Sequence, residues 1–92
     1  METQKHYNIS ISGRVQGVGF RYNARTIAQH FGIKGFVKNI PGDKVFIEAE
    51  GTESKLSEFI DWCHKGPDYA HIEKVDLIPG EMKYFNSFEI LR

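Results

Sequence analysis

Residues 13–21 read Gly-Arg-Val-Gln-Gly-Val-Gly-Phe-Arg and join a strand-like run to a helix-like run. Gly17 and Gly19 have no Cβ, so the backbone there can adopt positive φ and turn consecutive N–H groups towards one bound oxyanion. The helix that follows adds the unpaired N–H groups of its first turn and the positive end of its dipole. Arg21 falls in that first turn, where a cation is unfavourable unless an anion compensates it. The stretch is therefore interpreted as an anion-binding loop.

The glycines also fit a turn that binds nothing, with Arg21 pointing into water. If only the glycine content is considered, this turn is the simpler interpretation. Two known phosphate-binding motifs are excluded. A dinucleotide fingerprint needs a third glycine where Tyr22 stands, and a Walker loop needs Gly-Lys-Ser/Thr, which the sequence lacks. The choice between a plain turn and an anion site thus depends on the rest of the chain.

The apolar residues on either side of this loop indicate its flanking secondary structure. Before it, apolar and polar residues alternate over residues 7–12, which is typical of a strand with one covered face. After it, apolar residues recur at three- and four-residue spacing, as on one stripe of a helix that Gly32 can end. These residues are Phe20, Ala24, Ile27, Ala28 and Phe31. Residues 33–40 are predicted to contain the next strand, which ends in a hairpin turn over residues 39–43, where proline and glycine require a turn.

A second strand and helix follow this turn. Residues 45–50 alternate as a strand with one buried and one largely wet face, and Gly51 is predicted to end it. Thr52 is predicted to be the N-cap of a helix that closes at Gly66-Pro67. Cys63 lies on the apolar stripe of this helix and is interpreted as a small core residue, not as a nucleophile.

Two further strands are predicted over residues 72–78 and 85–91, with a loop over residues 79–84 between them. The order β-α-β-β-α-β plus a fifth strand is the ferredoxin-like, split βαβ pattern of the α+β class. In it, two helices pack on one face of a mixed, mostly antiparallel sheet. The first and third strands lie side by side in the middle, which brings the anion-binding loop near the end of the strand at 33–40. Residues 1–92 are expected to form one domain.

Charged residues are divided unevenly along a chain whose formal net charge is zero. Between Thr3 and Gly42 there are six basic residues and no acidic one, whereas from Asp43 onward eleven acidic residues face six basic ones. A positive potential around the loop would attract a small anion. A long nucleic acid would also meet the acidic half, so no nucleic-acid partner is expected.

The cysteine count and the hydropathy suggest where the chain works. Cys63 is the only cysteine, so no internal disulfide can form, and no apolar segment after Met1 suggests export. We therefore expect a cytoplasmic location and no segment that crosses or binds a membrane. The four histidines are scattered, and no pair has the spacing of a metal site on one element, so we expect neither a metal nor another cofactor.

Two segments together resemble the signature of the acylphosphatase family: residues 13–21, and Gly35-Phe36-Val37-Lys38-Asn39. Supporting matches run through most of the chain, namely Val45 with Gly51, Gly66-Pro67 and Phe88-Glu89-Ile90. The nine-residue block is highly specific, and its combination with the second motif on this predicted topology strengthens the resemblance. One departure is Gly42-Asp43, where members commonly carry Asp-Gly, and this leaves the hairpin type open.

The resemblance implies hydrolysis of the carboxyl–phosphate bond of acyl phosphates to a carboxylate and inorganic phosphate, without a metal or a covalent intermediate. By position, Arg21 matches the family's phosphate-binding arginine, and Asn39 matches its water-orienting asparagine. The family's phosphate loop corresponds to the backbone of Gln16, Gly17, Val18, Gly19 and Phe20. Inorganic phosphate or sulfate is then expected to compete with the substrate, and the chain is expected to be a monomer.

The alternative is a ferredoxin-like module that binds nucleic acid or a small ligand. Residues 34–37 are faintly similar to the aromatic RNA-binding strand of the RRM, but that motif belongs on the third strand. The balanced net charge also argues against nucleic acid. Considered by itself, Asn39 is more simply interpreted as a turn residue ahead of Pro41-Gly42. Together with the motif at residues 13–21, it is interpreted as a site residue. No residue outside the phosphate site identifies the acyl group.

Overall fold

A computed structural model describes residues 2–92, which form two helices and five strands. The elements in chain order are β1 (Gln4–Arg14), α1 (Phe20–His30), β2 (Lys34–Ile40), β3 (Lys44–Thr52), α2 (Glu53–Lys65), β4 (His71–Gly80) and β5 (Phe88–Ile90). This order confirms the predicted α+β, ferredoxin-like class. Across residues 2–92, neither helix has the length and apolar character needed to cross a membrane.

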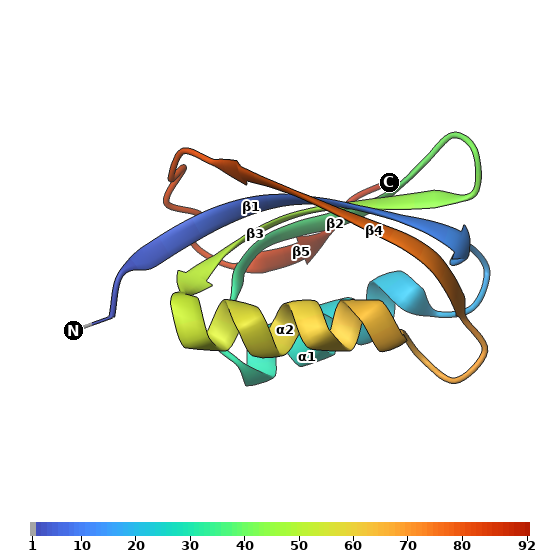
Figure 1. Cartoon of the computed structure of the whole chain (residues 1–92), viewed down its shortest axis with the longest axis horizontal. Helices are drawn as coiled ribbons and strands as arrows, with labels where there is room; N and C mark the ends of the chain where they lie inside the picture. The colour runs from blue at the N-terminus through green and yellow to red at the C-terminus, as the bar shows by residue number, and fades with distance from the viewer. Residues whose placement is uncertain (1) are drawn as a thin grey trace.

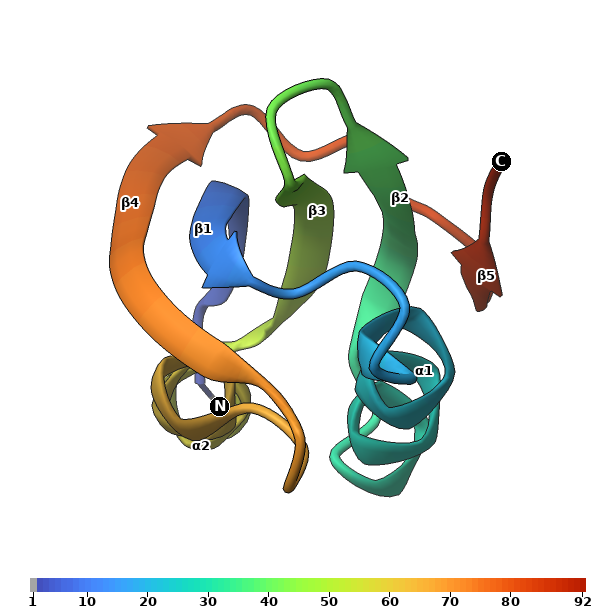
Figure 2. The ribbon, with the colours of Figure 1, turned by 90° about the vertical axis from the view of Figure 1, so that its right-hand side faces the viewer.

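The five strands form one sheet in the order β4-β1-β3-β2-β5. Every neighbouring pair is antiparallel except β2 and β5, which are parallel. Both helices lie against the same face of the sheet (Figure 1), and the view along the molecule shows α1 beneath the β2 side and α2 beneath the β4 side (Figure 2). The mixed, mostly antiparallel sheet and the side-by-side placement of β1 and β3 are both confirmed.

The core fills the space between the sheet and the helices. From the strands it takes Ile9, Ile11, Val37, Val45, Ile47 and Ala49, and from the helices Phe20, Ala24, Ala28, Leu56, Phe59 and Cys63. Ile9 pairs directly with Ile47 across β1 and β3, so a slip of one residue would turn both side chains to the other face of the sheet. Phe20, the first residue of α1, is 1% exposed and packs on Trp62 of α2. Its burial fixes the helix start, and with it the preceding loop, against the core.

Three strand ends differ from their predictions. β3 runs through Gly51 to Thr52, which is also the N-cap of α2, so the predicted end at Gly51 is wrong. β4 extends to residue 80 and includes Pro79, which an edge strand tolerates because one side of it has no ladder to maintain. The strand predicted over residues 85–91 narrows to Phe88–Ile90, because only three residues of β2 pair with it.

The face of β3 that points away from the helices was predicted to be largely exposed to solvent, and this prediction is wrong. Glu50 is 2% exposed and Glu48 8%. His6 of β1 lies between them, with Nδ1 2.7 Å from a Glu50 oxygen and Nε2 3.2 Å from a Glu48 oxygen. The segment after β4 covers the group: the backbone N–H groups of Lys83 and Phe85 donate to the Glu50 carboxylate, and Lys83 Nζ lies 2.7 Å from Glu48 Oε1. We call these five residues the His6 cluster, and its pairing explains how two carboxylates are buried.

The β2–β3 hairpin accommodates the reversed order Gly42-Asp43 in its backbone. Both residues have positive φ, 92° at Gly42 and 55° at Asp43. Ile40 and Lys44 form the last pair of the ladder, which leaves residues 41–43 as the connecting loop. Aspartate is one of the few residues other than glycine that enter this region readily, so the reversed order is accommodated locally.

Candidate active site

The loop between β1 and α1 has the backbone that its glycines predict. Gly17 has a φ of 73° and Gly19 a φ of 77°, and at such values any side chain would be strained. Gly19 is the N-cap of α1, and Asn23 Nδ2 donates a 2.8 Å hydrogen bond to its carbonyl oxygen. The prediction of positive φ at both glycines is therefore confirmed.

The N-terminus of α1 is left open for an anion. Within residues 2–92 no side chain makes a capping hydrogen bond to it, and its first turn contains no acidic residue. The first N–H groups of a helix have no partner within the helix, and together with the dipole they favour a negative ligand. Arg21 adds a full positive charge in the same turn.

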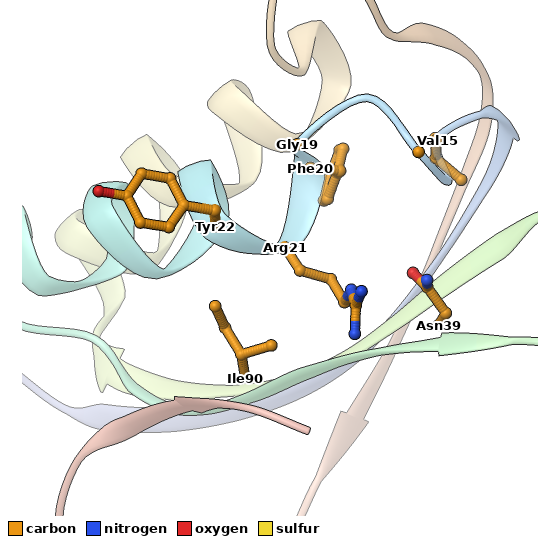
Figure 3. A pocket seen from close by; sticks show the side chains of 8 residues that line it. Val15, Gly19, Phe20, Arg21, Tyr22, Asn39 and Ile90 are labelled. Atoms are coloured by element: carbon orange, nitrogen blue, oxygen red, sulfur yellow. The ribbon is translucent and has the colours of Figure 1, made fainter. Parts of the chain in front are cut away.

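A cavity of about 190 Å³ opens beside this helix end (Figure 3). Its lining consists of Val15, Gly17, Gly19, Phe20, Arg21, Tyr22, Asn39 and Ile90. The two predicted catalytic residues, Arg21 from α1 and Asn39 from β2, thus share one cavity with the glycine loop.

The guanidinium of Arg21 reaches across the cavity towards Asn39 (Figure 3). Its Nη1 donates a 3.2 Å hydrogen bond to the carbonyl oxygen of Leu91, just after β5. A guanidinium carries five N–H donors in a planar fork, so this one contact orients the group and leaves other donors for a ligand. β5 therefore contributes to the site although it lies far from α1 in sequence.

Asn39 stands on the helix-facing side of β2, two residues beyond the buried Val37. Its Oδ1 is buried and accepts no hydrogen bond from any group in residues 2–92. A buried amide oxygen without a partner costs free energy, so a donor such as water fits this position. Such a water would lie next to the cavity that also holds Arg21.

Gln16 connects the loop to the hairpin that follows Asn39. Its Nε2 donates to the carbonyl oxygens of Ile40 at 2.8 Å and Lys44 at 3.0 Å. Its backbone N–H donates to Asp43 Oδ1 at 3.2 Å, so in this structure that N–H already has an acceptor. These three bonds fix the loop relative to the end of β2, and therefore relative to Asn39.

Neither Gln16 nor Val18 lines the cavity; Val18 instead lines a separate hollow with Trp62. Their expected contacts to phosphate are through the backbone, and the phosphate-binding roles of residues 16–21 stay predictions.

Among residues 2–92, no three His, Cys, Asp or Glu side chains gather as a metal site would require. The expected absence of a metal also stays a prediction.

Sequence reasoning missed three contributors to the cavity or its frame. Tyr22 and Ile90 line it, and the carbonyl of Leu91 holds Arg21. Leu91 lies 70 positions from Arg21, and no local pattern points to such a contact.

Comparison with known proteins identifies the family. Residues 7–90 match the acylphosphatase family model. The chain belongs to the acylphosphatase family. It is 44% identical over 82 residues to the acylphosphatase of Acaryochloris marina, covering 89% of this chain and 88% of that one. The acylphosphatase of Archaeoglobus fulgidus is also 44% identical over 82 residues, with 89% and 92% covered.

A solved acylphosphatase has the same architecture. The crystal structure of acylphosphatase from Bacillus subtilis matches with a TM-score of 0.93 at 31% sequence identity, over 96% of this chain and 99% of that one. The predicted resemblance is thus confirmed, and the chain is an acylphosphatase, a hydrolase of acyl phosphates. The alternative of a ferredoxin-like binding module is set aside.

Proposed function

We propose that this acylphosphatase works by direct, metal-free, in-line attack of a water molecule held by Asn39. The phosphoryl group is bound by Arg21 and by the backbone N–H groups of residues 16–20. The oxygen of the water forms a bond to phosphorus while the bond from phosphorus to the acyl oxygen breaks. The electron pair of the broken bond leaves with the carboxylate, and a proton of the water ends on the phosphate product.

The chemistry of acyl phosphates explains why so few side chains suffice. The leaving carboxylate has a pKa of about 4 to 5, so no general acid is needed to protonate it. The phosphoryl transition state is loose and carries charge on its equatorial oxygens, so the protein mainly has to position the reactants and neutralise that charge. Arg21 can hold two phosphoryl oxygens through parallel N–H donors, and the loop supplies preorganised backbone donors. Asn39 can orient the water without acting as a strong base.

One observation carries this proposal: Arg21 and the unpartnered Oδ1 of Asn39 meet at one cavity beside an uncapped helix N-terminus. If residues 13–21 formed only a turn, nothing would explain why the buried Oδ1 of Asn39 lacks a hydrogen-bond partner at the same cavity as Arg21. A reducing cytoplasm fits the single Cys63, and we expect the enzyme to act as a monomer.

The experiment compares phosphate binding and steady-state hydrolysis of benzoyl phosphate in wild type and two variants. Arg21→Lys keeps the charge but loses the planar fork, so it should weaken phosphate binding and lower kcat by about a hundredfold or more. Asn39→Ala leaves the anion site intact, so phosphate affinity should stay near wild type while kcat falls steeply.

Two results would reject these roles. If Asn39→Ala abolished phosphate binding and Arg21→Lys left it intact, the assignments would be reversed. If neither variant slowed hydrolysis, the reaction would take place elsewhere on the molecule. Circular dichroism and thermal melting of each variant serve as the folding control.

A further inference from the structure

A hollow of about 290 Å³ lies beside β2 and β5, and Phe36, Phe85, Glu89 and Leu91 contribute to its lining. We call it the outer hollow. Ile90 faces the catalytic cavity (Figure 3), and successive residues of an extended chain point to opposite sides. Glu89 and Leu91 therefore face the side of the sheet away from the helices, and the end of β5 separates the outer hollow from the catalytic cavity.

Two aromatic rings line the outer hollow. The centroids of Phe36 and Phe85 lie 5.9 Å apart, and the ring planes are nearly perpendicular at 87°. The face of an aromatic ring attracts a cation. Phe36 already does so, since Lys38 Nζ lies 5.9 Å from its ring centroid, although Lys38 does not line the outer hollow. The two rings therefore suit an apolar ligand that carries a positive charge.

The one charged side chain in the lining is the exposed carboxylate of Glu89. Among residues 2–92 this carboxylate forms no ion pair, and its hydrogen-bond partner is the hydroxyl of Ser87 at 3.1 Å. A carboxylate can accept several hydrogen bonds, so an ammonium group can still bind here. Aromatic walls with a few polar groups are typical of small-ligand sites, and this carboxylate favours a cation over an anion.

Leu91 connects the outer hollow to Arg21. Its side chain lines the hollow and is 39% exposed. Its N–H donates to the carbonyl oxygen of Val37 at 2.8 Å, and its carbonyl oxygen accepts the 3.2 Å hydrogen bond from Arg21 Nη1. A ligand that covers the side chain restricts Leu91, and it thereby restricts the guanidinium that is oriented by the Leu91 carbonyl. An arginine that is already ordered loses less entropy when it binds a phosphoryl group.

We propose that the outer hollow is an effector site for an organic cation, an ammonium group on an apolar body, and that its occupation strengthens phosphate binding at Arg21. Coupling between two binding sites is reciprocal, so phosphate strengthens cation binding by the same factor, about fivefold. The coupling rests on the proposed function, because it requires that Arg21 bind the phosphoryl group. The cation site itself does not depend on that function.

Calorimetric titration with 2-phenylethylammonium at pH 7 tests the cation site, and 2-phenylethanol serves as an uncharged probe of the same shape. The alcohol should bind about fivefold more weakly, because it forms neither the ion pair nor the cation–π contact. Glu89→Gln should weaken binding of the amine about threefold and leave binding of the alcohol unchanged. Glu58→Gln is the matched control, since Glu58 is an exposed carboxylate on α2, on the other side of the sheet.

Equal binding of the amine and the alcohol to wild type would overturn the cation site. Unchanged amine binding in Glu89→Gln, or equal losses in Glu89→Gln and Glu58→Gln, would also overturn it. Circular dichroism of each variant serves as the folding control.

Titration with inorganic phosphate, with and without saturating amine, tests the coupling. The amine should raise the phosphate affinity of wild type about fivefold, and Leu91→Ala, which keeps the backbone carbonyl, should reduce this gain to less than about twofold. Unchanged or weaker phosphate binding in the presence of amine would overturn the effector role and leave the proposed function standing. If phosphate did not bind wild type even without amine, the proposed function would fail and the coupling with it.

Discussion

Replacing Glu50 by glutamine should remove a large part of the stability of this protein. The carboxylate is almost fully buried and accepts hydrogen bonds from His6 at 2.7 Å, from the backbone of Phe85 at 3.0 Å and from the backbone of Lys83. A glutamine side chain has one acceptor oxygen and one NH₂ group. Its NH₂ group must therefore face at least one of the N–H groups that now donate to the carboxylate. It also removes the negative charge that faces the imidazole.

The size of the effect follows from the hydrogen bonds that the substitution breaks. Hydrogen bonds to charged groups contribute about 1.5 to 3 kcal/mol each without being additive. Domains of this size have a total free energy of unfolding of roughly 5 to 14 kcal/mol. We therefore expect Glu50→Gln to lower the free energy of unfolding by about 2 to 4 kcal/mol.

Urea titration of wild type and variant at pH 7, followed by circular dichroism, measures this loss. The matched control is Asp76→Asn on the same sheet face, because Asp76 pairs with Lys74 at 3.7 Å and both side chains are more than half exposed. That exposed pair should contribute less than about 1 kcal/mol. If Glu50→Gln cost no more than Asp76→Asn, the reasoning about the His6 cluster would be refuted.

The pH dependence of stability tests the same carboxylate in the wild-type chain. Burial by itself raises the pKa of Glu50, but the hydrogen bonds from Lys83, His6 and Phe85 outweigh burial and hold that pKa below its usual value of 4.5. A carboxyl whose pKa is lower in the folded state stabilises the fold above its unfolded pKa, and this stabilisation is lost as the pH falls through the folded pKa. Wild type should therefore lose stability below about pH 4.5, and Glu50→Gln should lose less over the same range.

Three further expectations concern the anion site and the thiol. Saturating inorganic phosphate should raise the melting temperature and inhibit hydrolysis competitively, because it binds the folded state at the anion-binding loop; an unchanged melting curve would argue against that role of the loop. Hydrolysis should persist in excess EDTA, and a loss restored by zinc or magnesium would overturn the metal-free mechanism. Burial raises the pKa of the Cys63 thiol, so alkylation of the folded protein should be slow, and fast alkylation with selective loss of turnover would contradict its place in the core.

The elements that could be predicted from the sequence are those whose residues carry a regular period. The apolar stripe of α1 and the alternation in β1 predicted that one is a helix and the other a strand, and which face of each is buried. Apolar residues recur with the period of the element because one face of it packs on the core. The glycine loop was predictable for a related reason: positive φ at Gly17 and Gly19 is a local property that glycine alone meets without strain.

The features that sequence reasoning missed depend on contacts between distant segments. Glu48 and Glu50 alternate with apolar residues, as residues on a solvent-exposed strand face do. They are buried because the segment that follows β4 covers them. The hydrogen bond from Arg21 to Leu91 requires β5 to lie beside β2, a pairing of only three residues. Such short, non-local pairings leave no period in the sequence.

β1 comes first in the chain yet lies between β3 and β4, so its hydrogen bonds close only when distant segments arrive. Ile9 pairs with Ile47 on one side and with Leu77 on the other, 38 and 68 positions further along. Each pairing closes a long loop, and the entropy of that loop is lost before the pairing energy is gained. We therefore expect this topology to fold more slowly than a helical bundle of the same size, whose contacts are mostly local. During folding the apolar face of β1 is open to other chains, so the yield of refolding should fall as the protein concentration rises.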